Sequence, residues 1–172
     1  MSGSSLIGVA IAIPEPWGAE LEGWRASFGD PQASAIPAHV TLLPPTKVPD
    51  DEIAGVQTHL AGAAADVAPF PVLLRGTGTF RPVSPVVFVS LASGIAGCEA
   101  LEQRVRSGPL ARELEFAYHP HVTVAHDLPD PVLDGAFEAL AAFEASFTVE
   151  DFVLYVHVDG AWTPRSSFHL RG

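Results

Sequence analysis

The chain has 172 residues, and 20 acidic side chains outnumber 9 basic ones to leave a net charge of −11. A protein that grips long RNA or DNA needs clustered cations, so this charge argues against long nucleic acid and leaves small phosphorylated molecules or RNA ends as partners. The lone Cys98 allows no internal disulfide, and no apolar stretch is long enough to span a bilayer. We therefore expect one monomeric, cytoplasmic domain over residues 1–172, without membrane contact.

The first half of the chain is predicted to alternate strands and helices. Residues 6–13 are apolar, lack a basic leader and stop at Pro14, which favours a strand over a signal peptide. A helix over 15–28 follows, because Leu21, Trp24 and Phe28 recur at helical spacing before Gly29. The next predicted elements are a strand over 38–43 that Pro44-Pro45 ends, a helix from 50 or 51 to about 67, and paired strands over 72–80 and 86–91.

The second half repeats the order of strand, helix, motif strand and helix. Its predicted elements are a helix over 94–106, a strand over 120–125, a helix over 132–143, and a hairpin of strands 148–158 and 162–170 across Asp159-Gly160. No low-complexity linker separates the halves. This weak duplication predicts an α+β fold with two lobes, in which two antiparallel or mixed sheets line a central cleft and the helices lie outside.

One tetrad occurs in both halves, as His39-Val40-Thr41-Leu42 and as His121-Val122-Thr123-Val124. Side chains alternate between the two faces of a strand, so each copy presents one imidazole and one hydroxyl on the same face and buries its two apolar residues. An imidazole exchanges a proton near neutral pH, and a hydroxyl donates a hydrogen bond to an oxyanion. Two such strands that face each other would suit acid–base chemistry on a phosphate.

The paired tetrads, the second preceded by Tyr118-His119-Pro120, resemble the two-histidine phosphoesterase superfamily and in particular its 2′-5′ RNA ligase-like branch. The opening segment, residues 8–14 before a helix that contains Trp24, is also similar to actinobacterial members of that family. The resemblance covers nearly the whole chain. It implies hydrolysis of a cyclic phosphodiester, such as a ribose 2′,3′-cyclic phosphate or an ADP-ribose cyclic phosphate, with no metal and no cofactor.

The resemblance also implies roles for the four polar residues of the tetrads. One of His39 and His121 takes a proton from the attacking water, while the other gives a proton to the leaving ribose oxygen. The hydroxyls of Thr41 and Thr123 donate to the non-bridging oxygens. The sequence does not say which histidine is the base. The alternative from another class is a silent module of the same fold that binds a nucleotide or an RNA end, although such a binder has no need of two opposed imidazoles.

A metal site is the alternative interpretation of the second tetrad. His119 and His121 are two positions apart, and His126 lies five residues further on. In a regular strand His126 faces away from His121, and the segment offers no cysteine or carboxylate as an inward ligand, so we expect no metal. Relatives often carry arginine at the position of His126, and the histidine here leaves a phosphate contact from that side open.

Other contacts to substrate are predicted from side-chain chemistry. Aromatic rings stack on nucleobases, and loop arginines bind terminal phosphates. The predicted substrate-binding residues are Tyr118, His119, Trp162 and Phe80. Weaker candidates are Phe88, which the apolar run 86–89 is expected to bury, and Arg81 and Arg165. The Gly-x-x-x-x-Gly-Lys-Ser/Thr pattern of nucleoside triphosphate binding is absent, which argues against energy-coupled ligation.

Overall fold

The computed structural model describes residues 3–172. The strands are β1 (Ser4–Ala12), β2 (His39–Pro49), β3 (Phe70–Thr79), β4 (Val86–Ser93), β5 (His121–His126), β6 (Glu144–Val149), β7 (Asp151–Val158) and β8 (Ala161–His169). The α-helices are α1 (Trp17–Ser27), α2 (Ile53–Ala65), α3 (Ile95–Val105) and α4 (Asp130–Ala139), and the short 3₁₀ helices are η1 (Pro31–Ser34), η2 (Asp50–Glu52) and η3 (Gly108–Leu110).

The strands form two four-stranded sheets, in the orders β2-β1-β7-β8 and β5-β4-β3-β6. Every pairing in both sheets is antiparallel. The α+β fold with two sheets is therefore confirmed, and the choice between antiparallel and mixed sheets is resolved in favour of antiparallel. Each motif strand, β2 or β5, lies at an edge of its own sheet, where it can face the other half of the molecule.

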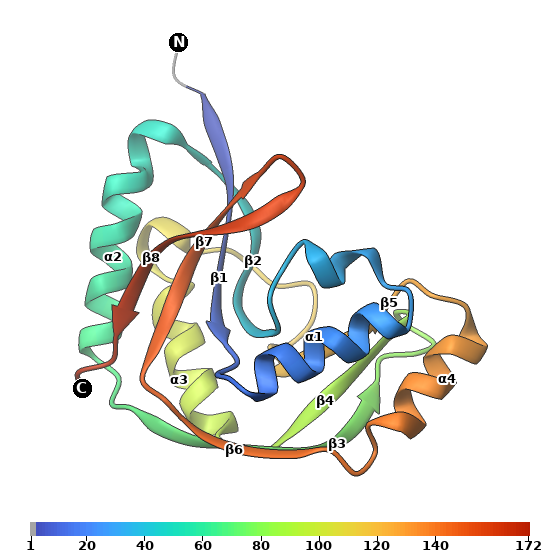
Figure 1. Cartoon of the computed structure of the whole chain (residues 1–172). Coiled ribbons are helices and arrows are strands. Elements are labelled where there is room, and N and C mark those ends of the chain that lie inside the picture. The colour runs from blue at the N-terminus through green and yellow to red at the C-terminus, as the bar shows by residue number, and fades with distance from the viewer. Residues whose placement is uncertain (1–2) are drawn as a thin grey trace.

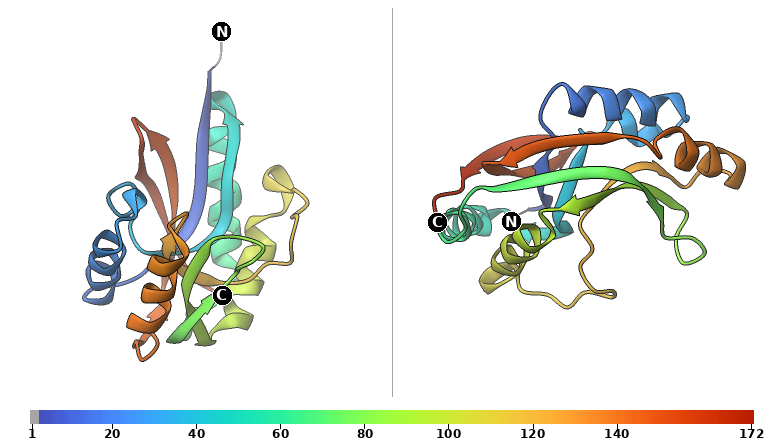
Figure 2. Two further views of the ribbon diagram at one scale, coloured as in Figure 1. Left: turned by 90° about the vertical axis from the view of Figure 1, so that its right-hand side faces the viewer. Right: turned by 90° about the horizontal axis from the view of Figure 1, so that it is seen from below.

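The helices tie the two halves together in a reciprocal way. Helix α1, which follows β1, contacts β5 of the other sheet, whereas α3, which follows β4, contacts β2. Strands β2 and β5 also contact each other. Figure 1 shows α2 and α3 beside each other on the left of the view and α4 on the right, and Figure 2 shows the two sheets as separate layers. Each motif strand thus packs against a helix from the other half of the chain, and these contacts hold β2 and β5 side by side.

The predicted end of the first motif strand at Pro44-Pro45 is wrong, because β2 continues to Pro49. Leu43 pairs with Val9 and Thr46 pairs with Ile7, so the two prolines fall in a break of register between these pairs. Proline lacks the N–H that a regular ladder needs, but an edge strand tolerates it at an irregularity. The strand therefore passes through two residues that usually end one.

The predicted strand over 148–158 is also wrong in its extent. The structure divides this region into β6, which pairs with β3 in the second sheet, and β7, which pairs with β1 in the first. Only Glu150 separates the two strands. Helix α4 correspondingly ends at Ala139 rather than at 143, and the chain is extended again from Glu144. A change of sheet leaves little trace in the sequence, since both strands are apolar and extended.

The terminal hairpin is confirmed, with β7 and β8 paired from Asp151↔His169 to Val158↔Ala161. Asp159 and Gly160 form its turn with φ values of 49° and 82°, the left-handed pair that a two-residue hairpin needs. Within residues 3–172, no helix is long and apolar enough to cross a membrane.

Candidate active site

The two tetrads lie at corresponding places in the fold, since His39 is the first residue of β2 and His121 is the first residue of β5. The predicted alternation is confirmed on both strands. All four histidine and threonine side chains of the tetrads are half-buried. The apolar residues between them are at most 1 % exposed and belong to the core, namely Val40, Leu42, Val122 and Val124. Burial of these alternate residues turns both imidazoles and both hydroxyls to the opposite face of their strands.

The two imidazoles are held by the same kind of hydrogen bond. Nδ1 of His39 lies 2.8 Å from the carbonyl oxygen of Pro37, and Nδ1 of His121 lies 2.6 Å from that of His119. A carbonyl only accepts, so each Nδ1 must donate, which leaves Nε2 of each neutral ring unprotonated. Each ring therefore has one nitrogen held by the backbone and the other able to exchange a proton with a ligand.

Both imidazoles favour the neutral form in the free protein. Burial lowers the pKa of His39 to about 4, with further lowering by the charges of Arg25 and His121, although the bond to Pro37 opposes the shift. Burial also lowers the pKa of His121, the bond to the carbonyl of His119 opposes this, and the charge of the His119 ring adds to the lowering. The effect of His121 on the pKa of His39 agrees with the contact between β2 and β5.

The two threonine hydroxyls are available to a ligand. Among residues 3–172, no hydrogen-bond partner is found for Oγ1 of Thr41 or Thr123, and no side-chain polar atom is both buried and unpaired. These hydroxyls therefore keep contact with solvent on the face that carries the imidazoles. An unpaired hydroxyl beside an imidazole can donate to an oxygen of a bound phosphate.

Aromatic side chains surround His121. The ring centroids of Phe80 and Phe88 lie 4.9 Å and 5.2 Å from that of His121, and the His119 ring lies 5.7 Å away. Phe88 is 5 % exposed, which confirms its predicted burial, whereas Phe80 is half-buried and His119 is exposed. Two of the predicted substrate-binding residues, Phe80 and His119, thus lie next to the second tetrad, and their contact with substrate stays a prediction.

A pocket adjoins the first tetrad. It has a volume of about 110 Å³, and both His39 and Thr41 line it. Trp162 from β8 lines the same pocket and packs over Gly8, where an added Cβ would lie 3.4 Å from the indole ring. The third predicted substrate-binding residue is therefore next to the first tetrad, whereas Phe80 lies next to the second. Its contact with substrate also stays a prediction.

Tyr118, the fourth predicted substrate-binding residue, links the two halves. Its hydroxyl donates a 2.7 Å hydrogen bond to the carbonyl oxygen of Thr41. Burial raises the pKa of Tyr118, and the thiol of Cys98 and the carboxylate of Glu102 add to this, so the hydroxyl stays protonated. Tyr118 therefore joins the segment before β5 to β2, next to the histidines.

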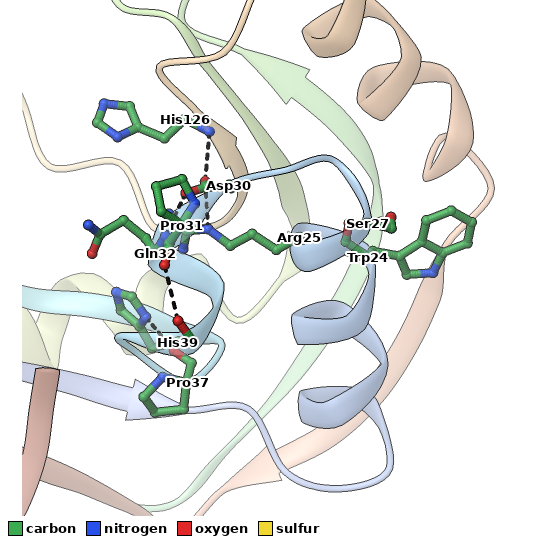
Figure 3. Close-up of polar contacts among 10 residues, drawn as sticks. Trp24, Arg25, Ser27, Asp30, Pro31, Gln32, Pro37, His39 and His126 are labelled. Atoms are coloured by element: carbon green, nitrogen blue, oxygen red, sulfur yellow. Dashed lines mark hydrogen bonds and ion pairs between the residues drawn. The ribbon is translucent and has the colours of Figure 1, made fainter.

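A second link between the halves depends on Asp30. This carboxylate accepts hydrogen bonds from Nε of Arg25 at 2.8 Å and from the backbone N–H groups of Gln32 at 2.9 Å and His126 at 3.0 Å. Figure 3 shows the Arg25 side chain reaching from α1 to Asp30, with His126 beyond it and His39 near by. The carboxylate thus joins α1, η1 and the end of β5, while Tyr118 joins the start of β5 to β2.

Sequence reasoning missed this pair and misjudged the helix that carries it. The spacing of Leu21, Trp24 and Phe28 predicts an apolar stripe, but Trp24 is 37 % exposed and Arg25 is buried. Burial of Arg25 is possible because Asp30, only 3 % exposed, neutralises it. The only local signal was Asp30-Pro31 after Gly29, which indicates a turn and says nothing of a partner on β5.

The weaker candidates lie away from the tetrads or have other partners. The guanidinium of Arg81 bonds Asp134 at 2.9 Å and Thr79, and Arg165 is exposed on β8. The side chain of His126 is exposed, whereas its backbone N–H bonds Asp30. Within the part of the chain that the structure describes, no three His, Cys, Asp or Glu side chains are grouped to hold a metal ion. Independence from metal stays a prediction.

Comparisons with known proteins agree with this architecture. A protein of Bacillus licheniformis named "Putative phosphoesterase" is 33% identical over 144 residues, which are 82% of this chain and 85% of the relative. Escherichia coli LigT in its apo form has the same fold, with a TM-score of 0.72 at 23% identity over 99% of this chain and 100% of LigT. Its complex with 3′-AMP matches with a TM-score of 0.67 at 21% identity and the same coverage. The family model of the 2′-5′ RNA ligase superfamily matches residues 13–161, a range that contains both tetrads, so the chain belongs to that superfamily.

Proposed function

We propose that this protein is a phosphoesterase that hydrolyses a cyclic phosphodiester, either the 2′,3′-cyclic phosphate of a nucleotide or RNA end or an ADP-ribose cyclic phosphate. The observation that carries the proposal is the matched pair of Nδ1-to-carbonyl bonds, which leaves Nε2 of His39 and His121 free in two adjacent halves. Phosphoesterase activity is further supported by the name of the Bacillus relative. The complex of the similarly folded LigT with 3′-AMP favours a nucleotide substrate.

In the proposed reaction one imidazole removes a proton from water as the water oxygen bonds to phosphorus. The other imidazole, which reacts in its protonated form, donates the proton on Nε2 to the ribose oxygen whose bond to phosphorus breaks, so the ring opens to a phosphomonoester. Thr41 and Thr123 donate hydrogen bonds to the non-bridging oxygens, where negative charge accumulates. No step in this sequence requires a metal ion or a cofactor.

The test is hydrolysis of 2′,3′-cyclic nucleotides and an ADP-ribose cyclic phosphate in excess EDTA by the wild type, His39→Ala and His121→Ala. We expect turnover to survive EDTA and to fall by about 10²- to 10⁴-fold in each variant, the usual worth of one acid–base group. His169→Ala, which removes an exposed imidazole near the end of β8, is the matched control and should keep full activity.

Two other outcomes would contradict this proposal in different ways. Binding of nucleotides without cleavage of any substrate would support a binding module of the same fold instead. Activity that EDTA abolishes and Zn²⁺ restores would show that a metal ion does the chemistry and that His119 and His121 belong to its site.

A further inference from the structure

The pocket beside the first tetrad contains a buried tyrosine that the sequence did not single out. Tyr155 from β7 lies opposite Gly8 of β1 in the ladder, and both residues line the pocket with His39 and Thr41. Because neighbours across a ladder share one face of the sheet, Tyr155 projects on the same side as the pocket floor at Gly8. The pocket therefore has an aromatic phenol in its wall, next to the proposed catalytic groups.

The hydroxyl of Tyr155 has no protein partner. The residue is only 3 % exposed, yet no hydrogen bond to its hydroxyl is found among residues 3–172. No side-chain polar atom of those residues is both buried and unpaired, so the hydroxyl keeps some contact with solvent. The pocket is the opening that Tyr155 lines, and we infer that the hydroxyl reaches solvent there.

An unpaired hydroxyl in such a place calls for a functional explanation. The rest of this side chain is buried, and phenylalanine would fill the same space, so the fold itself does not require a hydroxyl that bonds no protein group. Tyr118 provides the contrast, because its hydroxyl is bonded to the carbonyl of Thr41. The Tyr155 hydroxyl is also a reliable donor, since burial and the charges of Asp151 and Glu22 raise its pKa.

We propose that Tyr155 and Trp162 form a subsite for the part of the substrate that adjoins the reacting phosphate on the His39 side, a sugar or single ring that carries a hydrogen-bond acceptor. This inference rests on the proposed function. The pocket volume of about 110 Å³ is several times the space that one water molecule needs and suits one ring. The indole supplies a flat apolar wall, and the phenol donates the hydrogen bond that orients the ring.

The test compares two ligands that share a phosphate and differ in the sugar and base. Binding of 3′-AMP and of inorganic phosphate to the wild type and to Tyr155→Phe is measured by calorimetry. We expect the Kd for 3′-AMP to rise about tenfold in Tyr155→Phe, because one hydrogen bond is lost, while the Kd for phosphate stays the same. The Tm should stay the same or rise, since the removed hydroxyl has no protein partner.

A stability control separates this role from a structural one. Tyr118→Phe also removes one phenol oxygen, but it breaks the bond to Thr41 and should lower the Tm. Unchanged affinity for 3′-AMP in Tyr155→Phe would overturn the subsite, and so would an equal loss for 3′-AMP and phosphate, which would place the hydroxyl on the phosphate itself. If Tyr155→Phe weakens binding of 3′-AMP but the wild type hydrolyses no substrate, the subsite is supported and the proposed hydrolysis is refuted.

Discussion

At the scale of single residues, the two halves of the site are similar in geometry and unequal in proton affinity. The imidazoles of His39 and His121 make the same bond to a backbone carbonyl two residues earlier. Burial nevertheless lowers the pKa of His39 to about 4, whereas the pKa of His121 is lowered less. The group with the lower pKa is neutral when the other is protonated, which favours His39 as the base and His121 as the acid of hydrolysis.

This assignment predicts an acidic optimum for kcat/KM. Below about pH 4, His39 becomes protonated and cannot accept a proton, and above the pKa of His121, which is lower than 6.5, the acid is lost. We therefore expect a bell-shaped profile with its maximum on the acidic side of pH 6.5. Steady-state kinetics across the acidic and neutral range measures it, with His169→Ala as the control. A plateau that continues above neutral pH would contradict the assignment.

The threonines should affect rate without affecting stability. Thr41→Val and Thr123→Val keep the shape and the β-branching of the side chain but remove a hydroxyl that has no partner among residues 3–172. We expect kcat to fall by about 10²- to 10³-fold in each variant, the cost of one donor to a developing oxyanion. Thermal unfolding should give a Tm that is unchanged or higher. A large loss of Tm would show that the hydroxyls are structural.

At the scale of secondary-structure elements, two links hold β5 to the first half of the chain. Tyr118 bonds the carbonyl of Thr41 before β5 begins, and Asp30 bonds the N–H of His126 at its end. The two links lie at opposite ends of β5, so one fixes its start to β2 and the other fixes its end to α1 and η1. The histidines lie at the first positions of those strands, so their separation follows from these links and from the crossed packing of α1 and α3.

Loss of the Asp30 link should destabilise the whole domain. Asp30→Ala leaves the buried Arg25 without its counter-charge and removes the acceptor of two backbone N–H groups. We expect a loss of about 3–5 kcal/mol in the free energy of unfolding, measured in urea. Glu144→Ala breaks the exposed pair with Arg75 and should cost less than about 1 kcal/mol. Equal losses of unfolding free energy in the two variants would show that the buried ion pair stabilises the domain no more than the exposed pair does.

At the scale of the whole molecule, the net charge bears on the size of the substrate we expect. The net charge is −11, and most arginines already pair with carboxylates, such as Arg104 with Asp66 and Arg81 with Asp134. A surface of this kind repels a polyanion but leaves a local site with neutral imidazoles and hydroxyl donors open to one phosphate. We therefore expect small nucleotides or RNA ends as substrates.

This expectation predicts a weak dependence on salt. A ligand that contacts one or two phosphates loses little affinity when the salt concentration rises from about 50 to about 200 mM, whereas long nucleic acid held at many phosphates loses orders of magnitude. KM for a cyclic nucleotide should therefore change by no more than a few-fold over that range. Fluorescence polarisation should detect no salt-sensitive binding of a long single-stranded RNA along its length, and such binding would refute the expectation.

Much of the fold could be predicted because alternating apolar residues and turn-forming pairs indicate strands and turns locally. The alternation of His39, Val40, Thr41 and Leu42 predicts a strand and its buried face, and Asp159-Gly160 predicts the hairpin that the structure contains. The passage of β2 through Pro44-Pro45 could not be predicted in this way. It depends on β2 being an edge strand with a break in register, and that is a property of the sheet rather than of the two prolines.

The sequence by itself determined the α+β class, the two tetrads and the face on which their imidazoles and hydroxyls lie, because strand periodicity is a local property of the chain. Only the tertiary structure decided that Asp30 would join α1 to β5, that β6 and β7 would enter different sheets, and that the phenol of Tyr155 would line a pocket beside His39. These features depend on contacts between residues far apart along the chain. No periodicity encodes such contacts, since they form only when the sheets and helices pack together.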